Sequence, residues 1–349
     1  MKKILRMAVS LTMAAAMVLA LAACGGNDSA SDKGDSDANE VIEISIGHIY
    51  NTNHNEAIAL ETLKTRLEEE SGGRIKLKIF PSSQLGSERE MAEQVALGTL
   101  DMGLSDGPTW SNALNVPELA VFGLPYLYKD IDGQVNAFDE ILTVADQYMT
   151  PAGVKPLFCF SASIRGAIMV TKPINTLEDI SGVKMRVPEI SMYVDTWKSL
   201  GANPTTTAWG EAYTALQQGV VDGCEVDPST IVDANIQEVT NYFSKTNHMG
   251  TVHIISMNLD KWNSIPEDLQ QIILDVSKEV STAQADDRKV TDEASVQKMV
   301  DAGVVVNDVA DEELEKMKNA VQPLYDQYDQ EYGLGETIEK LQAFGWNEN

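Results

Sequence analysis

Hydrophobic and polar residues alternate with two different periods in the first part of the chain. Every second residue is apolar at 42–46 and at 75–79, a pattern typical of strands with one buried face. Apolar residues recur at helical spacing at 58–67 and 88–97, and a short strand pattern follows at 100–105. The order strand, helix, strand, helix, strand predicts a mostly parallel sheet covered by helices.

The later part of the chain repeats this alternation. We expect strands at 167–171, 183–187, 221–226 and 252–257, and helices at 191–200 and 209–218. A helical pattern with few Gly or Pro residues then runs from Pro266 to about Val300, and helices continue through 312–332. A helix of that length indicates one that spans two domains. We therefore expect two α/β domains, with the ligand site in the cleft between them, at the carboxyl ends of the strands.

The first 40 residues have a different composition. A short cationic start precedes an uncharged run at 7–23, which is typical of an export signal, since it is short for a membrane span and lacks a charged stop. Leu21-Ala22-Ala23-Cys24 resembles the bacterial lipobox, which implies a signal peptide at 1–23 and lipidation of Cys24. Residues 24–40, rich in Ser, Asp, Asn and Gly, predict a flexible tether. The expected product is anchored by lipid outside the cytoplasm, on the outer face of the membrane or in the periplasm.

Composition narrows the class of partners. The chain has 26 Lys and Arg against 53 Asp and Glu, a formal charge of −27, and such a chain repels nucleic acid and anionic lipid. Its 43% hydrophobic residues suffice for real cores, and its 349 residues favour two domains. An anionic ligand would need a local buried cation that reverses the potential at its site.

Cysteine and histidine spacing favours neither a metal site nor a redox site. With Cys24 lipidated, Cys159 and Cys224 remain, and we expect two free thiols, with a disulfide between them as the alternative. Cys159 lies in the apolar run 157–160, which is typical of a buried strand in which Cys acts as a small hydrophobic residue. The chain has no C-x-x-C and no H-E-x-x-H sequence. No metal and no cofactor are expected.

Five segments together resemble the solute-binding proteins of tripartite ATP-independent periplasmic (TRAP) transporters, the DctP family. They are FPSSQLG at 80–86, GTLD at 98–101, LPY at 124–126, GVKMRV at 182–187 and YTALQQGVVDG at 213–223, and the resemblance covers roughly Val41 to Tyr332. It implies a periplasmic-binding-protein-like clamshell of two α/β domains. Such a protein captures a small organic acid outside the membrane, delivers it to a permease of one small and one large subunit, and has no chemistry of its own.

The domain boundaries are expected where the chain crosses between the two halves. We place the first α/β domain at 41–163 plus 252–291 and the second at 164–251 plus 292–332. A C-terminal extension follows at 333–349. The long helix that begins near Pro266 then belongs to both domains.

The resemblance assigns the central role to the Arg of the Gly-x-Lys-x-Arg strand, which here is Arg186. In the family this Arg forms a two-pronged salt bridge with the ligand carboxylate. A guanidinium suits that role because its planar fork matches both carboxylate oxygens. The alternative is a surface Arg paired with a local acid, and it fits less well, because Lys184 and Arg186 share one side of an otherwise apolar strand.

Other candidate contacts follow from the same resemblance, each beside a plainer alternative. Arg165 lies near the ligand or is an exposed loop residue, and Trp209 packs on the ligand or in the core between domains. Asp106 and Glu88 bind ligand hydroxyls or ordered water, or are solvated acids. Asn53 faces the cleft or caps the following helix.

One segment departs from the family pattern. After Asp222-Gly223 the family often has Gln-Glu-Asn, whose Asn supports the bound carboxylate, whereas this chain has Cys224-Glu225-Val226. Val226 cannot donate a side-chain hydrogen bond, so a different acid or a different pose is expected. Glu225 contacts ligand hydroxyls or braces the strand from inside, and Tyr213 is a further candidate contact.

Two other functions compete with this interpretation. A lipid-anchored hydrolase could use paired carboxylates such as Asp222 and Glu225, although no phosphate loop or His-based triad is apparent. A binding protein of an ATP-driven (ABC) importer would share the fold class. We expect no enzyme but a TRAP solute-binding lipoprotein. Hydroxylated sugar acids fit the candidate acids beside one or two Arg residues better than short dicarboxylates do, and keto acids and aromatic acids stay open as alternatives.

Overall fold

Nine strands pair into one sheet in residues 41–346, the part of the chain that this computed structural model describes. The order across the sheet is β2-β1-β3-β8-β4-β7-β5-β6, and β9 pairs with β8 outside this path. The strands are β1 (Ile42–Gly47), β2 (Ile75–Phe80), β3 (Met102–Asp106), β4 (Val154–Met169), β5 (Lys184–Val187), β6 (Asn203–Thr206), β7 (Gly223–Val226), β8 (Tyr242–Asn258) and β9 (Val305–Asp308).

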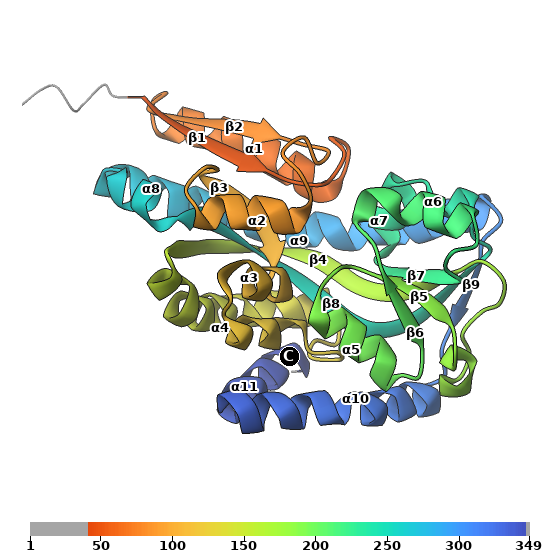
Figure 1. The fold of residues 1–349 in the computed structure, drawn as a ribbon. Coiled ribbons are helices and arrows are strands. Elements are labelled where there is room, and N and C mark those ends of the chain that lie inside the picture. The colour runs from red at the N-terminus through yellow and green to blue at the C-terminus, as the bar shows by residue number, and fades with distance from the viewer. Residues whose placement is uncertain (1–40, 347–349) are drawn as a thin grey trace, which may run out of the picture. The chain divides into compact units, whose positions relative to one another are not determined.

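Helices cover the sheet, and Figure 1 shows the last two, α10 and α11, next to one another. The helices are α1 (Asn55–Glu70), α2 (Glu88–Ala96), α3 (Gly107–Leu114), α4 (Ile131–Met149), α5 (Ser191–Ser199), α6 (Ala212–Gln217), α7 (Pro228–Asp233), α8 (Leu259–Ser264), α9 (Glu267–Asp301), α10 (Asp311–Tyr332) and α11 (Gly335–Trp346). The α/β alternation expected from the hydrophobic pattern is therefore present.

The centre of the sheet is antiparallel, which the pattern did not predict. β1 pairs in parallel with β2 and β3, and β5 pairs in parallel with β6 and β7. Between these groups run β4 and β8, two strands of 16 and 17 residues that pair with each other in antiparallel fashion. Sequence analysis expected only short parts of both, at 157–160 and 167–171 in β4 and at 252–257 in β8. The remainder was missed because a strand buried on both faces loses the period-2 signal.

The long helix expected from Pro266 to Val300 is confirmed as α9, which has 35 residues. Its first half buries an apolar face that includes Leu269, Ile273 and Val280. Further along, the buried face becomes polar and carries Gln284 and Arg288. α9 contacts α1 and β4, and also α7 and β9.

The proposed domain boundaries fall inside elements of this fold. The limits after residues 163, 251 and 291 lie within β4, β8 and α9, respectively. Residues 41–346 pack into one compact unit. The division into two domains therefore remains a prediction.

Five helices had no counterpart in the expected pattern, namely α3, α4, α7, α8 and α11. α4 and α11 pack against each other, and Gly133 of α4 meets the carbonyl of Gly345 of α11 so closely that an added Cβ would lie 2.3 Å from that oxygen. Phe138, Ile141 and Ala145 recur at helical spacing in α4, a signal that sequence analysis did not use. The C-terminal extension thus includes an ordered helix that packs against the core.

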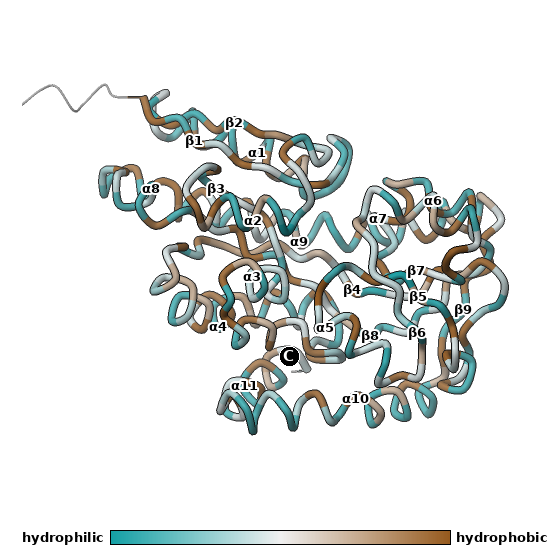
Figure 2. Tube along the Cα trace, viewed as in Figure 1, coloured by the Kyte–Doolittle hydropathy of each residue, from teal (hydrophilic) through white to brown (hydrophobic). Residues whose placement is uncertain are grey.

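Three hydrophobic clusters fill the space between sheet and helices. One lies around β1, β2 and α1, the second around α4, α5 and α10, and the third around α6, α7 and β7. Figure 2 shows α10 as mostly teal with brown at intervals, as expected of a helix with one face in the core. The clusters hold the strand ends that carry the functional side chains.

Both remaining cysteines, Cys159 and Cys224, are buried free thiols. Burial raises the pKa of the Cys224 thiol to about 11, so it stays protonated at neutral pH. Residues 41–346 contain no helix long and apolar enough to cross a membrane and no cluster of potential metal ligands. The predicted lipidation site, Cys24, lies outside the described residues.

Candidate ligand-binding site

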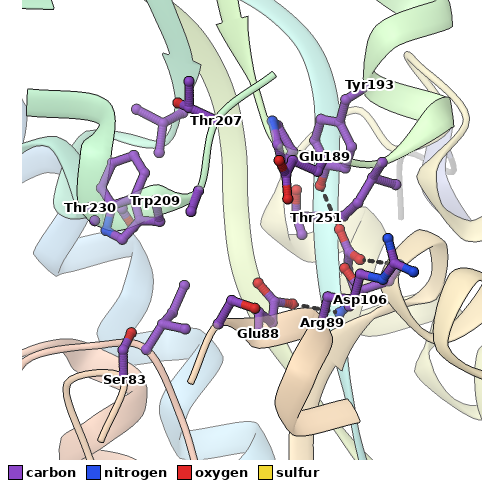
Figure 3. Close-up of a pocket in the computed structure, with 18 of the residues that line it drawn as sticks. Ser83, Glu88, Arg89, Asp106, Glu189, Tyr193, Thr207, Trp209, Thr230 and Thr251 are labelled. Carbon is purple, nitrogen blue, oxygen red and sulfur yellow. Dashed lines mark hydrogen bonds between the residues drawn. The ribbon is translucent and has the colours of Figure 1, made fainter. Parts of the chain in front are cut away.

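A cavity of about 360 Å³ lies where the loops after six strands meet. The segments that follow β1, β2 and β3 line one part of it, and those that follow β5, β6 and β7 line another. β4 and β8 contribute Arg165, Thr251 and His253. Figure 3 shows Thr207 and Trp209 on one side of the cavity and Tyr193 with Asp106 on the other. The cavity therefore lies at the carboxyl ends of the parallel strands, where a ligand site was expected.

Six of the nine candidate ligand contacts line this cavity. They are Arg186, Arg165, Trp209, Asp106, Glu88 and Val226. These residues come from separate segments between positions 88 and 226, so the fold places residues that are distant in sequence in one cavity.

Arg186 presents a buried positive charge to the cavity. Only 3% of the residue is exposed, and its Nη2 donates to the carbonyl oxygen of Thr207 over 2.5 Å, while Nε donates to Thr207 Oγ1 over 3.3 Å. The Trp209 ring centre lies 5.4 Å from its Cζ. Within residues 41–346 no carboxylate oxygen lies within 4.0 Å of the Arg186 nitrogens. A buried cation without an acid partner is costly, and an anionic ligand would compensate it.

Arg165 already has a carboxylate partner. Its Nε and Nη2 donate to Glu225 Oε2 and Oε1 over 2.5 and 2.8 Å, and its guanidinium lies 5.1 Å from the Tyr193 ring centre. Burial opposes the charge of Arg165, but the Glu225 carboxylate raises its pKa well above the ordinary value. The pair adds no net charge to the cavity.

The carboxylate of Asp106 is held by the protein itself. It caps α3 by accepting from Thr109 N over 2.7 Å, and its second oxygen accepts from the Tyr193 hydroxyl over 2.5 Å. Asp106, at the end of β3, lines the cavity but is only 5% exposed, because both of its carboxylate oxygens face these protein donors. Ligand hydroxyls would have to share oxygens that already accept hydrogen bonds.

Glu88, the first residue of α2, lies beside Asp106. Its Oε1 accepts from Asp106 N over 3.3 Å, and burial together with the charge of Asp106 raises the pKa of Glu88 to about 7. On the adjacent strand β8, burial alone would lower the pKa of His253, but the Glu56 carboxylate at 2.8 Å helps to raise it to about 9. The cavity wall therefore holds a cationic His and an acid that titrates near neutrality.

Three candidates do not line the cavity. Asn53 is exposed, and the cap of α1 is His54, whose side chain accepts from Glu56 N, so Asn53 does not cap this helix. Glu225 is fully buried and braces Arg165 from behind, as its structural alternative stated. Tyr213 lies on α6 outside the cavity, with its hydroxyl 3.4 Å from Glu238 Oε2. The predicted helix 209–218 begins with a 3-10 turn at Trp209–Glu211, which turns Trp209 to the cavity and Tyr213 away from it.

Several lining residues were not anticipated. They include Tyr50, Arg89, Glu189, Tyr193, Thr207, Thr251 and His253. Tyr193 could have been found, because it lies in the first turn of the helix that follows the Arg186 strand. Thr251 and His253 had no signal, because β8 reaches the cavity only through long-range pairing with β3 and β4.

A buried arginine on α9 forms an ion pair with a residue that lines the cavity. Arg288 is fully buried, and its Nη2 donates to Asp227 Oδ1 over 2.5 Å, while its Nε lies 3.3 Å from Asp292 Oδ1. Burial would raise the pKa of Asp227, but Arg288 lowers it to about 2. Asp227 caps α7 and lines the cavity, so this ion pair connects the long helix to the site.

Two further cavities lack an available cation. One of about 310 Å³ is lined by Lys245 and Lys289, but Lys245 lies 3.0 Å from Asp308, and Lys289 pairs with Asp132. The other, of about 200 Å³, has Asp195 as the charged residue in its wall. The cavity around Arg186 is therefore the candidate site for an acid.

The sequence contains one hydrolase motif whose serine lacks the geometry of an active site in the structure. Gly103-Leu104-Ser105-Asp106-Gly107 matches the Gly-x-Ser-x-Gly pattern, which sequence analysis overlooked. Ser105 is 1% exposed, pairs in register with Ile254 inside the sheet, and its Oγ has no hydrogen-bond partner in the described residues. A serine nucleophile needs an exposed Oγ beside a base, so this segment does not support a hydrolase.

The family model named DctP, bacterial extracellular solute-binding protein family 7, matches residues 46–331. The chain belongs to this family. A C4-dicarboxylate-binding periplasmic protein DctP of Vibrio cholerae is 27% identical over 329 residues, which cover 93% of this chain and 95% of that protein. The expected family is thus confirmed, and family membership places this chain among extracytoplasmic binding proteins.

Two solved structures resemble this DctP-family protein closely. A TRAP periplasmic solute-binding protein of Roseobacter denitrificans with bound β-D-glucuronate has a TM-score of 0.82 and 27% identity, over 88% of this chain and 100% of that one. One of Chromohalobacter salexigens with bound D-glucuronate has the same TM-score and identity, over 86% and 99%. The expected α/β clamshell fold class is confirmed by these structures.

Proposed function

We propose that this DctP-family protein is the solute-binding component of a TRAP transporter that captures a sugar acid through Arg186 and delivers it to the membrane permease. The observation that carries the proposal is the buried guanidinium of Arg186, which lines the cavity without an acid partner among residues 41–346. Thr207 holds one edge of the guanidinium, so its fork is oriented before a carboxylate arrives.

The wall around Arg186 supports a hydroxylated ligand. Thr109 and Thr251 line the cavity, and the Oγ1 atom of each is buried without a hydrogen-bond partner in the described residues. Such hydroxyls, with Glu88, would pair with ligand hydroxyls. Both similar structures hold glucuronate, an acid with several hydroxyls.

The charges of the wall favour one carboxylate over two. Arg165 is neutralised by Glu225, so the cavity offers a single unpaired guanidinium. A second carboxylate would face the carboxylate of Asp106. We infer that monoacids such as uronates and aldonates bind more tightly than C4-dicarboxylates.

Calorimetry with a panel of acids tests this function. Glucuronate, galacturonate, galactonate and succinate are titrated into the protein from residue 41 onward, and a sugar acid at one hundred times its Kd should also stabilise the fold by about 2.7 kcal/mol. Arg186→Ala should abolish binding, and Arg186→Lys should lower affinity at least about 100-fold, because Lys keeps the charge but loses the fork.

Lys184→Ala is the matched control. Lys184 lies two residues before Arg186 on the same strand and is exposed, so its removal changes the net charge equally but leaves the cavity intact. It should bind as the parent protein does. Equal binding by Arg186→Ala and the parent would refute carboxylate capture by Arg186.

Anchoring by lipid at Cys24 is a further part of the proposal. The lipobox-like sequence before Cys24 and the acidic tether support it, because two or more acyl chains hold a protein of any charge at the membrane. In cells, the full chain should fractionate with membranes, and Cys24→Ser should release it into the soluble extracytoplasmic fraction. Recovery of the unsubstituted chain as a soluble protein would contradict the anchor.

The alternatives have weaker support. A hydrolase would need a catalytic group facing the cavity, whereas Ser105 is inside the sheet and Glu225 is bound by Arg165 and lies 3.3 Å from His248 Nε2. An ABC importer is disfavoured because the similar structures and the family belong to TRAP systems. We therefore propose a binding protein without catalytic activity, built from the two domains set out above.

A further inference from the structure

Glu88 and Asp106 place two carboxyl groups next to each other in the cavity wall. Both oxygens of Asp106 accept hydrogen bonds from the protein, one from Thr109 N and one from the Tyr193 hydroxyl. Glu88 Oε1 accepts from Asp106 N, whereas no donor among residues 41–346 lies within hydrogen-bond distance of Glu88 Oε2. Of the two neighbouring acids, Glu88 is thus the one with an oxygen available for a proton.

The surroundings of Glu88 combine acids and bases from several elements. The charged and titratable groups that act on it or line the wall beside it are Asp106 on β3, Glu56 on α1, His253 on β8, Tyr193 on α5, Tyr50 after β1, and Arg89 and Glu90 on its own helix. The amino end of α2 favours a negative charge at Glu88. Burial and Asp106 outweigh this effect and hold the pKa of Glu88 at about 7.

Two histidines near the cavity, His253 and His54, titrate in other pH ranges. The Glu56 carboxylate keeps His253 cationic, with a pKa of about 9 despite burial. Burial and Arg288 lower the pKa of His54 to about 3, and burial also lowers that of His48. Of Glu88, His253 and His54, Glu88 is therefore the group whose charge changes between about pH 6 and pH 8.

We propose that ligand capture is coupled to protonation of Glu88, which binds the sugar acid as a neutral carboxylic acid and donates a hydrogen bond to one of its oxygens. The inference rests on the proposed function, because it requires an oxygen-rich anion in this cavity. A bound anion displaces water from around Glu88 and adds a negative charge to the site. Both effects favour the neutral form of Glu88, so the complex takes up a proton.

The coupling also determines specificity. A neutral Glu88 tolerates a nearby carboxylate or ring oxygen that an ionised Glu88 would repel, and it adds a donor where Asp106 offers acceptors. A protein with net charge −27 would otherwise hold two ionised acids against an anionic ligand. Glu88 is in this sense a specificity-determining residue whose charge depends on pH.

Calorimetry with D-glucuronate at about pH 6 and pH 8 tests the inference, in two buffers that differ in ionisation enthalpy. Affinity should be about tenfold weaker at pH 8 than at pH 6, and close to one proton should be taken up at pH 8. Glu88→Gln keeps the shape and a donor but cannot titrate. It should bind with the same affinity at both pH values and take up no proton.

Glu211→Gln is the control, because it makes the same charge change at an exposed Glu that lies near Trp209 but does not line the cavity. It should keep the pH dependence of the parent, and melting curves check that both variants fold. Binding with equal affinity at both pH values and no proton uptake would overturn the inference and leave the proposed function standing. Pronounced pH dependence that survives in Glu88→Gln would overturn it as well. If no acid of the panel binds at either pH, the proposed function fails and this inference fails with it.

Discussion

Arg165 and Arg186 line the same cavity, but the Glu225 carboxylate neutralises Arg165 alone. Glu225 lies opposite Ala167 in the pairing of β4 with β7, and Arg165 two residues earlier on β4 reaches the same carboxylate. Arg186, on β5, has a backbone carbonyl and a hydroxyl as partners instead of an acid. The motif around Arg186 indicated its role from sequence. The neutralisation of Arg165 did not follow from sequence, because it depends on the register of strands about 60 residues apart.

Val226 offers a second test at the scale of one residue. It lines the cavity with 2% exposure, at the position where the family often has an Asn. Val226→Asn adds a donor and acceptor to an apolar part of the wall. We expect it to change the ranking of acids, with a shift of about tenfold in the ratio of two Kd values, or about 1.4 kcal/mol.

Calorimetry with the same panel of acids measures this ratio. Val226→Ala separates the effect of the amide from that of volume, since it shortens the side chain without adding polar atoms. The ranking should change with Asn and not with Ala. An unchanged ranking in Val226→Asn would show that this position does not select the ligand.

At the scale of elements, the period of the hydrophobic pattern predicted strands and helices with one buried face. It missed most of the two central strands, which are buried on both faces. The strand at 42–46 and the helix at 88–97 were predicted correctly, because each has one apolar and one polar face. β4 and β8 were predicted only in part, because both their faces are covered. Turns and bulges in β4, such as the register shift between Ser161 and Ile164, have no signal in a period-2 pattern.

α9 shows the same limit within one helix. Its existence and ends were predicted from the run after Pro266, yet Gln284 and Arg288 would be assigned to the solvent side by their polarity. Both are buried, because Gln284 donates to Asn55 Oδ1 and Ser161 O and because Arg288 pairs with Asp227. Such residues are compatible with the core only through partners from distant segments, so single-residue polarity misplaces them.

At the scale of the whole molecule, charge connects stability to pH. Glu88 and Asp292 hold protons in the folded state up to about pH 7 and about pH 6, because burial raises the pKa of each carboxyl and a neighbouring acid, Asp106 and Asp227 respectively, adds to the effect. In the unfolded chain both groups would lose their protons at lower pH. The folded state therefore binds more protons over this range, and acidification favours it.

His253 acts in the same direction. Burial lowers its pKa, but Glu56 helps to raise it to about 9, so the stabilisation from this pair is fully present below the ordinary His pKa and is lost as pH rises through about 9. Burial would raise the pKa of Asp227, but Arg288 lowers it to about 2, so the stabilisation from Asp227 is lost only in strong acid. Acidification also reduces the self-repulsion of a chain with charge −27.

We therefore expect the ligand-free protein to be most stable near pH 5 and to lose on the order of 3 kcal/mol of unfolding free energy between about pH 5 and pH 9. Urea denaturation of residues 41–349 at a series of pH values measures this change. High salt separates the two causes, because it screens the repulsion between surface charges but not the buried groups Glu88, His253 and Asp292. Glu88→Gln should flatten the part of the curve between about pH 5 and pH 7, where Glu88 binds a proton in the folded state alone. Stability that is constant or that rises toward pH 9 would contradict the assigned charges of these three groups, and with them the electrostatic basis of the acid-binding cavity.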